Sequence, residues 1–377
     1  MKNLALLSLI SLLGACGTTS GEEPAAGPAR DGGAPTRGRD AAPAAQADAA
    51  RALDASAPAP DAPPTAPDGP GVPAVDYCNA TDPRQLAPRV FATPEAGERP
   101  YLEVLERATR SVRVQVYLMG TGGILTTLMA KAQAGVRVQV ILDGEQGRDT
   151  NQRYFDQLVA AGAEVLWSDP QFSYMHAKFI VVDEHDALVT TGNYSARYSI
   201  NLERNFVAQL ADPADVADLV TLFDADWSRA SPDMRCTRLL VSPINAKDRI
   251  LALIGSAQRT LQIESMQLAD RDVRAAVSAR KQAGVEVRAL LADASWITAN
   301  ADAATFLKGL GIPVKHIPHL HTKVLIVDGA RAYFGSENFS VTSLTRNREV
   351  GLIVTEPSSV APLLATFEQD WTAGVDF

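Results

Sequence analysis

The chain has 377 residues, with 44 acidic and 35 basic side chains and a formal net charge of −9. No run of Lys and Arg interrupts this acidic balance, and binding to duplex nucleic acid without regard to sequence needs a basic face that displaces counterions. The composition therefore argues against a general nuclease, although an acidic protein can still contain a local basic groove. The hydrophobic fraction of 46% is ample for a buried core.

The chain begins with Lys2 and an apolar run at residues 4–13. A positive start followed by a short hydrophobic stretch predicts a secretory signal rather than a membrane span. The run ends in the sequence LGAC, which closes at Cys16 and resembles the lipobox of bacterial lipoproteins. The resemblance implies a signal peptide at residues 1–15, a lipid on Cys16, and, because Gly17 follows, export to the outer membrane or cell surface. An ordinary signal peptide with a chance cysteine is the alternative.

After Cys16 the chain changes to Ala, Pro, Gly and Asp, with few large apolar side chains up to about residue 76. Such a composition cannot bury enough apolar surface to form a core. We therefore predict that residues 16–77 are the lipidated cysteine and a disordered tether. The remaining length suits two fused lobes, which we place at residues 78–230 and 231–377.

Two further cysteines, Cys78 and Cys236, remain if Cys16 carries a lipid. An exported protein matures in an oxidising environment, where an even number of thiols favours a disulfide. The bond would join the start of the first lobe to the start of the second. Two buried free thiols are the alternative, because sequence gives no distance between the sulfur atoms.

Strand-like and helix-like runs alternate through both lobes. The sequence AGVRV at residues 134–138 returns as AGVEV at residues 283–287, each time between a helix-like run and an apolar strand. This internal duplication predicts an α/β fold of two similar lobes, each a mixed β-sheet flanked by helices. Strand-like runs lie at residues 112–118, 136–142, 260–266 and 285–291, and helix-like runs at residues 124–133 and 273–282.

The most constraining feature is a motif that occurs once in each half. It reads H-x-K-x4-D, with His176, Lys178 and Asp183 in the first copy and His321, Lys323 and Asp328 in the second. A polar turn follows at equal distance, with Thr191 and Asn193 in the first copy and Ser336 and Asn338 in the second. Each turn is followed by N-x-E, as Asn201-Leu-Glu203 and Asn347-Arg-Glu349. A lone H-x-K would be an ordinary surface-to-core transition, but the complete duplicated set favours a functional role.

The chemistry of this set follows from the residue types. On a strand, the His and Lys of one motif would point to the same face. An imidazole can serve as nucleophile or general acid near neutral pH, and a nearby carboxylate fixes its tautomer. Ammonium, amide and hydroxyl groups donate hydrogen bonds to an anion. Two such sets suit phosphoryl transfer by double displacement, provided that the lobes pack with pseudo-twofold symmetry and bring both motifs together.

These motifs resemble the HKD motifs of the phospholipase D superfamily, over roughly residues 85–377. The resemblance implies one active site at the junction of the lobes, a phosphohistidine intermediate, no cofactor and no metal. By motif position it assigns His176 as the nucleophile and His321 as the acid/base, with Glu203 and Glu349 as the carboxylates that orient them. Its expected phosphate ligands are Lys178, Lys323, Asn193, Asn338, Thr191 and Ser336. Asp183 and Asp328 complete the catalytic motif and are expected to be mainly structural.

Two points qualify the resemblance. The first turn has Thr190-Thr191 where Gly-Ser is usual, so strict symmetry between the half-sites is not expected. His316, His319 and His321 are close in sequence, but no Cys or paired carboxylate accompanies them, so we expect no metal site.

A lipid anchor would place phospholipid headgroups within reach of the lobes. The leading prediction is therefore a phospholipase D-type hydrolase, a phosphodiesterase that cleaves or transfers a phosphatidyl group. The alternatives are a nuclease with the same site, a cardiolipin-synthase-like phosphatidyltransferase, which the lack of membrane-spanning runs before the lobes weakens, and a non-enzymatic surface adhesin. The expected partners are the phospholipid substrate and the membrane, and the presence of both motifs in one chain favours a monomer.

Overall fold

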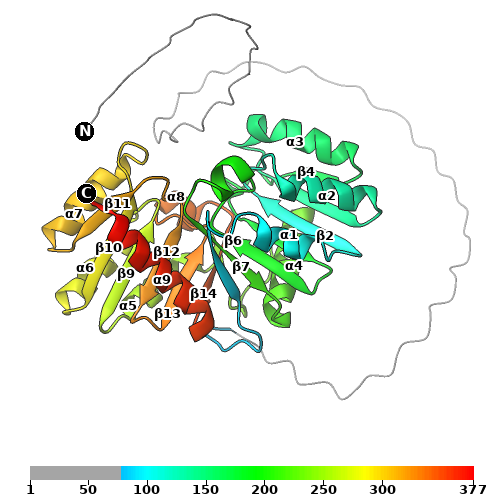
Figure 1. The fold of residues 1–377 in the computed structure, drawn as a ribbon. Helices are drawn as coiled ribbons and strands as arrows, with labels where there is room; N and C mark the ends of the chain where they lie inside the picture. Colours follow the sequence, from blue (N-terminus) through cyan, green and yellow to red (C-terminus); the bar gives the residue numbers. More distant parts are fainter. Residues whose placement is uncertain (1–77) are drawn as a thin grey trace, which may run out of the picture. The chain divides into compact units, whose positions relative to one another are not determined.

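A computed structural model of the protein describes residues 78–377. The predicted signal peptide, Cys16 and the tether lie outside the described residues. Within residues 78–377, two similar lobes are each built on one mixed β-sheet (Figure 1). The predicted α/β fold of two similar lobes is confirmed, whereas the lobe boundary at residues 230 and 231 stays a prediction.

The first lobe contains a seven-stranded sheet in the order β1-β7-β6-β5-β2-β3-β4. Strands β2, β3 and β4 are parallel to one another, and the other neighbours are antiparallel. The strands are β1 (Arg89–Thr93), β2 (Ser111–Val116), β3 (Arg137–Leu142), β4 (Glu164–Trp167), β5 (Phe179–Val182), β6 (Asp186–Thr190) and β7 (Asn205–Leu210). The helices are α1 (Arg99–Leu105), α2 (Gly123–Gln133), α3 (Arg148–Ala160) and α4 (Pro213–Ser228), with a π-helical turn η1 (Ala196–Ile200).

The second lobe repeats this arrangement in an eight-stranded sheet in the order β15-β11-β10-β9-β12-β13-β14-β8. Its strands are β8 (Leu240–Ser242), β9 (Thr260–Ser265), β10 (Glu286–Ala292), β11 (Val314–Ile317), β12 (Lys323–Val327), β13 (Arg331–Gly335), β14 (Glu349–Val354) and β15 (Val375–Asp376). Its helices are α5 (Ala246–Gly255), α6 (Arg271–Gln282), α7 (Ala299–Gly309), α8 (Val341–Thr345) and α9 (Pro357–Ala373). Strands β8 to β14 correspond in order to strands of the first sheet, and β15 extends the far edge.

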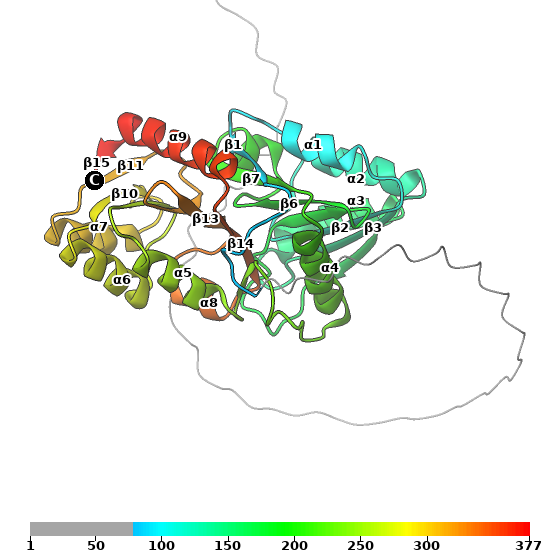
Figure 2. The ribbon, with the colours of Figure 1, turned by 90° about the horizontal axis from the view of Figure 1, so that it is seen from below.

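Helices cover both faces of each sheet (Figure 2). Apolar side chains of α1, α2 and α3 pack on one face of the first sheet, and those of α5, α6 and α7 on one face of the second. The opposite faces share one central core, to which α4 and α9 contribute. Strand β5 explains why the sequence there is continuously apolar: Phe179 and Val181 face the central core, while Ile180 and Val182 face the outer one.

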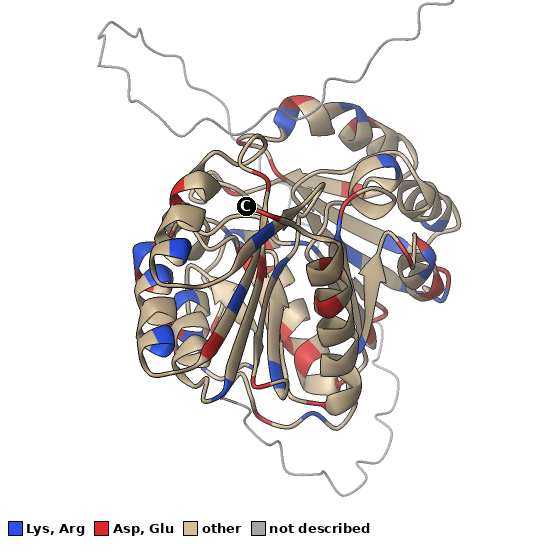
Figure 3. Ribbon diagram, turned by 60° about the vertical axis from the view of Figure 1, so that its left-hand side comes forward, with Lys and Arg blue, Asp and Glu red and all other residues tan. Residues whose placement is uncertain are grey.

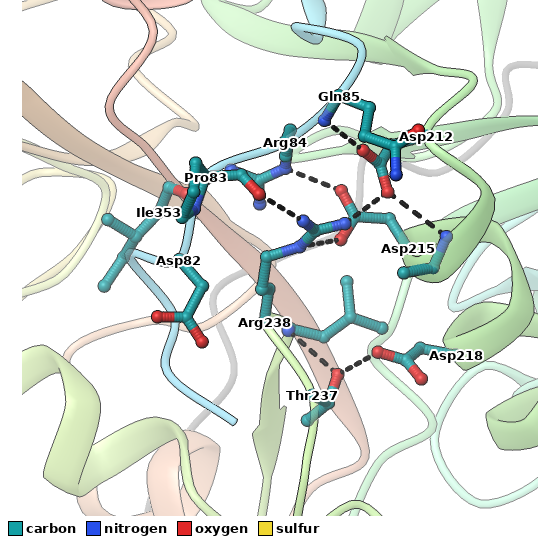
Figure 4. Close-up of polar contacts among 12 residues, drawn as sticks. Asp82, Pro83, Arg84, Gln85, Asp212, Asp215, Asp218, Thr237, Arg238 and Ile353 are labelled. Carbon is teal, nitrogen blue, oxygen red and sulfur yellow. Dashed lines mark hydrogen bonds and ion pairs between the residues drawn. The ribbon is translucent and has the colours of Figure 1, made fainter. Parts of the chain in front are cut away.

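An ion-pair cluster fastens the start of the described chain to both lobes (Figure 4). Asp215 on α4 accepts hydrogen bonds from Arg84 Nε at 2.6 Å and from Arg238 Nε at 2.8 Å. Arg238 also pairs with Asp212, and Arg84 donates to the carbonyl of Ile353 on β14 at 2.9 Å. Buried guanidinium and carboxylate groups are costly unless they are paired, so this cluster fixes where the segment before β1 crosses the junction.

Candidate active site

The two H-x-K segments meet at the junction because each is bonded to the backbone of the other lobe. The amide of His176 donates to the carbonyl of Arg348 at 2.9 Å, and the amide of His321 donates to the carbonyl of Arg204 at 3.2 Å. Arg348 immediately precedes β14, and Arg204 immediately precedes β7. The backbone of each lobe therefore fixes the position of the histidine of the other lobe. The two histidines and their partners form two half-sites of one site. His176 and Lys178 lie just before β5, rather than on the strand as the alternation predicted.

In the first half-site, His176 pairs with a buried carboxylate. His176 Nδ1 lies 2.7 Å from Glu349 Oε2, and Glu349 Oε1 accepts from Ser343 Oγ at 2.5 Å and Asn347 Nδ2 at 2.9 Å. Burial raises the pKa of the Glu349 carboxyl, but the charge and the hydrogen bond of His176 lower it. The lowering outweighs the effect of burial, so the net shift is downward. A carboxylate at Nδ1 holds the proton there and leaves Nε2 for chemistry.

In the second half-site, His321 pairs with an amide instead. His321 Nδ1 lies 2.9 Å from Asn205 Oδ1, whereas Glu203 Oε2 is 3.8 Å away. Asn205 Nδ2 donates to the carbonyl of Ser199 at 2.9 Å, which fixes the amide so that its oxygen faces the imidazole. His321 therefore also carries its proton on Nδ1. Burial lowers the pKa of His321 well below its usual value, and the Lys323 and Lys178 ammonium groups lower it further.

The pairing of Asn201-x-Glu203 with Asn347-x-Glu349 was wrong as a structural alignment. The amide of Thr191 donates to the carbonyl of Phe206 at 3.0 Å, and the amide of Ser336 donates to the carbonyl of Val350 at 3.0 Å. This register makes Asn205 of the first lobe the structural equivalent of Glu349 of the second, and Glu203 the equivalent of Asn347. The first lobe has one more residue between its polar turn and this strand, which the π-helical turn η1 accommodates. The sequence E-R-N in one lobe thus matches N-R-E in the other.

The motif lysines are buried beneath the histidines. Lys178 Nζ donates to the carbonyl of His176 at 2.5 Å, and Lys323 Nζ donates to the carbonyl of His321 at 2.6 Å. Burial lowers the pKa of Lys178 to about 7 and that of Lys323 to about 8, although Glu349 opposes both shifts. Two cationic donors at the bottom of one site can neutralise a phosphate oxygen each.

The expected phosphate ligands on the polar turns divide into two groups. Thr191 and Ser336 are fully buried, and neither hydroxyl is free to reach a substrate. Thr191 Oγ1 donates to Asn205 Oδ1 at 2.8 Å, while Ser336 Oγ accepts from the amide of Val350 at 3.0 Å. Both hydroxyls therefore bind the strand that carries the partner of the histidine. The expected contact of Thr191 and Ser336 with the phosphate is not supported by this arrangement.

The amides of Asn193 and Asn338 are half-buried. Asn193 Oδ1 accepts weakly from the amide of Leu118 at 3.4 Å. Asn338 Oδ1 has no hydrogen-bond partner among residues 78–377. Both amides keep hydrogen-bonding capacity for a ligand, so their role in phosphate binding stays a proposal.

The motif aspartates do not face the histidines. Asp183 follows β5 at its far end, where its carboxylate accepts from the amides of Thr109, Arg110 and Ser111 at 2.8 to 2.9 Å. Burial raises the pKa of this carboxyl, but the backbone hydrogen bonds outweigh burial and bring it to about 2. Asp328 accepts in the same way from three successive amides that lead into β9, those of residues 258, 259 and 260. Both side chains join the H-x-K strand to its neighbour, which is the structural part expected of them.

Some site residues gave no signal in the motifs. Asp143, at the end of β3, accepts from the amide of Met175 at 2.7 Å and so fixes the residue next to His176. The ring of Tyr117 lies 5.0 Å from the His176 ring, and Lys178 Nζ lies 5.5 Å from the Tyr117 centroid. A lone Asp or Tyr after a strand is too common to be recognised, and only the fold shows that these strand ends face the site.

Glu337 is a further buried acid, within the second polar turn. Its Oε2 accepts from Tyr333 Oη at 2.7 Å, and burial, followed by the charge of Glu349, raises its pKa to about 8. A Cβ at Gly335 would lie 2.3 Å from Glu337 Oε2, and one at Gly351 would lie 2.7 Å from it. The two glycines therefore make room for a buried carboxyl whose pKa is raised.

The structure also describes three features outside the two half-sites. Cys78 and Cys236 form a disulfide, which joins the segment before β1 to the segment before β8. Within residues 78–377, no group of three or more His, Cys, Asp and Glu side chains is arranged to hold a metal ion. In the same part of the chain, none of the helices is long and apolar enough to span a membrane.

A two-lobed α/β fold with one histidine from each lobe, and with buried lysines beneath them, defines an enzyme site for phosphodiester chemistry of the phospholipase D type. A family model described as "Cardiolipin synthase, PLD-like domain" matches residues 101–227 and 250–371. The chain therefore belongs to this phospholipase D-like family, which confirms the resemblance of its motifs to those of the phospholipase D superfamily.

Individual relatives agree with the family assignment. A probable cardiolipin synthase of Bacillus subtilis is 22% identical over 73% of this chain, which spans 64% of that protein. A mitochondrial cardiolipin hydrolase of Danio rerio is 29% identical over 33% of this chain and 56% of that protein. The solved structure of phosphatidylserine synthase from Haemophilus influenzae shares the fold, with a TM-score of 0.63, 12% identity, and coverage of 77% of this chain and 87% of that one. The chain thus spans just under two thirds of the Bacillus relative.

Proposed function

We propose that this protein is a phosphatidyltransferase that works through a phosphohistidine intermediate. The observation that carries the proposal is the crossed pair of half-sites, in which Glu349 and Asn205 occupy the Nδ1 atoms of His176 and His321 and leave both Nε2 atoms for chemistry beside two buried lysines. The relatives support transfer to an alcohol more than the hydrolysis that we predicted first.

The first step is attack of His176 Nε2 on the phosphorus of a bound phosphatidyl ester. A phosphorus–nitrogen bond forms, and the bond from phosphorus to the leaving alcohol oxygen breaks. His321, as an imidazolium, gives its Nε2 proton to that oxygen. The negative charge of the substrate favours this imidazolium, because it raises the pKa of His321 and of both lysines above their values in the empty site.

The second step reverses these roles with a new alcohol. His321 Nε2 removes the proton of the acceptor hydroxyl, the acceptor oxygen bonds to phosphorus, and the bond to His176 Nε2 breaks. Lys178 and Lys323 stay in contact with the phosphate oxygens, and Asn193 and Asn338 supply further donors. The enzyme returns to its starting state without a net change in protons.

Water as the acceptor gives hydrolysis, which is the second candidate. The name of the Danio rerio relative favours it. A nuclease is the less favoured third candidate, because the chain carries a net charge of −9 and no run of Lys and Arg. In the ribbon of Figure 3, Lys and Arg (blue) are interspersed with Asp and Glu (red).

One experiment separates these reactions. The full chain is incubated in mixed micelles with phosphatidylglycerol, and in parallel with duplex and single-stranded DNA. Transfer converts two phosphatidylglycerol molecules into cardiolipin and glycerol, whereas hydrolysis yields phosphatidic acid and glycerol. His176→Ala is the matched control and should abolish either product. Cleaved DNA with intact lipid would overturn the proposal of a lipid substrate.

We further propose that the protein is an exported monomeric lipoprotein that reaches phospholipids from an anchor on Cys16. This proposal depends on the LGAC sequence and the composition of residues 16–77. Cys16→Ser should release the protein from membranes while activity on dispersed lipid is retained, because the tether alone would join the anchor to the lobes. Membrane-bound Cys16→Ser protein would contradict the lipobox interpretation.

A further inference from the structure

The arginines that immediately precede β14 and β7 each extend their side chains across the junction. Arg348 precedes β14 in the second lobe and pairs with Asp226 on α4 of the first, at 2.9 Å. Arg204 precedes β7 in the first lobe and pairs with Asp370 on α9 of the second, at 2.6 Å. These arginines also supply the carbonyls that hold His176 and His321. We call the two pairs the first strut (Arg348–Asp226) and the second strut (Arg204–Asp370).

In the first strut, an amide completes the hydrogen bonding of the aspartate. Asp226 Oδ1 accepts from Arg348 Nε at 3.1 Å, and Asp226 Oδ2 accepts from Gln115 Nε2 at 2.8 Å. Gln115 lies on β2, where it pairs in register with Phe179. The aspartate is therefore held by two donors, one charged and one neutral.

In the second strut, an acid occupies the position of that amide. Glu264 lies on β9 and pairs in register with Val324, which stands three residues after His321 just as Phe179 stands three residues after His176. Asp370 accepts from Arg204 Nε at 2.6 Å and from Arg204 Nη2 at 3.0 Å. Glu264 therefore occupies the position equivalent to Gln115, which in the first strut donates a hydrogen bond to the aspartate.

The surroundings of Glu264 provide no donor for an ionised carboxylate. The side chain is fully buried, and neither oxygen accepts a hydrogen bond from any donor within residues 78–377. Gln115 donates to Asp226 in the first strut. Glu264 and Asp370 occupy the equivalent positions in the second, so the carboxyl that faces Glu264 is that of Asp370. Two carboxyl groups can share a hydrogen bond only if one of them carries a proton.

We propose that Glu264 is a neutral carboxylic acid whose hydroxyl donates to Asp370, and that it acts as a positioning residue for His321 through Asp370 and Arg204. The second strut is then a proton-dependent lock between the lobes, whereas the first strut, completed by Gln115, contains no second acid beside its aspartate. This inference stands on the fold and does not depend on which ester or acceptor the enzyme uses.

The charges around Glu264 explain why its proton is retained. Asp370 faces it from α9, Arg204 from the segment before β7, and Glu95 binds the far side of the same guanidinium at 2.5 Å. Nearby, Arg288 on β10 is already paired with Glu368 on α9. Loss of the proton would leave three carboxylates around one guanidinium. Burial, and then the charge of Asp370, raise the pKa of Glu264 well above its usual value.

The direction of the pH effect follows from this raised pKa. An acid whose pKa is higher in the folded than in the unfolded state stabilises the fold fully below the unfolded value, near 4.3. That stability is lost as pH rises towards and through the folded value. The second strut should therefore weaken from mildly acidic to alkaline pH. Since the carbonyl of Arg204 holds the amide of His321, the placement of His321 should loosen in parallel.

The test compares Glu264→Gln with Gln115→Glu, because each variant gives one strut the partner of the other. The melting temperature of the full chain is measured from pH 5 to pH 9. The difference between Glu264→Gln and the parent should grow with pH by about 2 °C per pH unit, since the variant cannot ionise. Gln115→Glu should match the parent near pH 5 and melt progressively earlier above it.

Activity supplies a readout that packing alone would not change. Glu264→Ala should lower kcat more than it changes KM, and Glu264→Gln should restore kcat because the amide again donates to Asp370. Melting curves of the parent and Glu264→Gln that run parallel across pH would overturn the proposal. A Gln115→Glu variant with the pH slope of the parent would also overturn it. Neither stability result depends on the identity of the substrate, so both stand even if the proposed transfer reaction fails.

Discussion

His176 of the first lobe and the fully buried Glu349 of the second lie 2.7 Å apart, from Nδ1 to Oε2. Because this bond crosses the junction, the first half-site is incomplete in either lobe alone. The opposite half-site is crossed in the same way, between His321 and Asn205, at 2.9 Å. The two histidines therefore share a topology but differ in the charge of the group behind them.

The first prediction concerns that carboxylate. Glu349→Gln should lower kcat/KM by about 10²-fold or more, since an amide stabilises neither the tautomer nor the developing cation of His176 as a carboxylate does. The measurement is the rate with a p-nitrophenyl phosphodiester. Glu203→Gln is the matched control and should lose less than about tenfold, because Glu203 stands 3.8 Å from His321. Equal losses in the two variants would contradict the unequal half-sites.

The second prediction makes the half-sites alike. Asn205→Asp would place a carboxylate 2.9 Å from His321 Nδ1, which favours the imidazolium. The pKa of His321 should rise, and the limb of the kcat/KM profile that reports it should move to higher pH by about one unit. Thr191→Val, which removes a donor to Asn205 but adds no charge, should leave that limb close to its original position. An unmoved limb in Asn205→Asp would show that Asn205 does not control His321.

The duplicated motifs predicted much of the fold and the central residues of the site. Two H-x-K copies with equal downstream spacing are a local signal, and they located His176, His321 and the lysines without any knowledge of contacts. The alternating apolar runs also predicted both mixed sheets. Each of these inferences depends only on residues close together in the chain.

The partners of the histidines could not be predicted in the same way. Glu203 was paired with Glu349 by counting residues, but a single extra residue at η1 shifts the register so that Asn205 faces His321. Likewise, Thr191 and Ser336 matched a phosphate-binding turn, yet they are fully buried against the next strand. Register and burial are set by pairing between distant strands, and a spacing rule does not contain that information.

The third prediction concerns the lysines and pH. In the free enzyme the pKa of Lys178 is lowered to about 7 and that of Lys323 to about 8, first by burial, so both ammonium groups are lost as pH rises through this window. Affinity for a phosphonate monoester analogue, whose single negative charge is constant over this range, should therefore fall between pH 6.5 and 9. Lys178→Arg should bind less tightly at pH 6.5 but lose less affinity at alkaline pH, because Arg stays charged. A flat profile for the parent would contradict the lowered pKa values.

The fourth prediction concerns metal ions. The lysine and amide donors can stabilise the transferring group without a divalent cation, so activity should persist after dialysis against EDTA. The measurement is the turnover of phosphatidylglycerol before and after chelation. A loss that zinc, calcium or magnesium restores, with the protein still folded by circular dichroism, would reject this mechanism.

The last prediction separates the roles of the two histidines. His321→Ala should still allow slow attack on a p-nitrophenyl ester, because p-nitrophenol leaves without help from an acid. The phosphohistidine on His176 should then persist, since nothing remains to activate the acceptor. His176→Ala should form no adduct. Mass spectrometry of peptides after brief incubation decides between the roles, with His185→Ala as a control at an exposed histidine distant from this chemistry. An adduct on His321 in the His176 variant, with none on His176 in the other, would exchange the two assignments and make the amide-paired histidine the nucleophile.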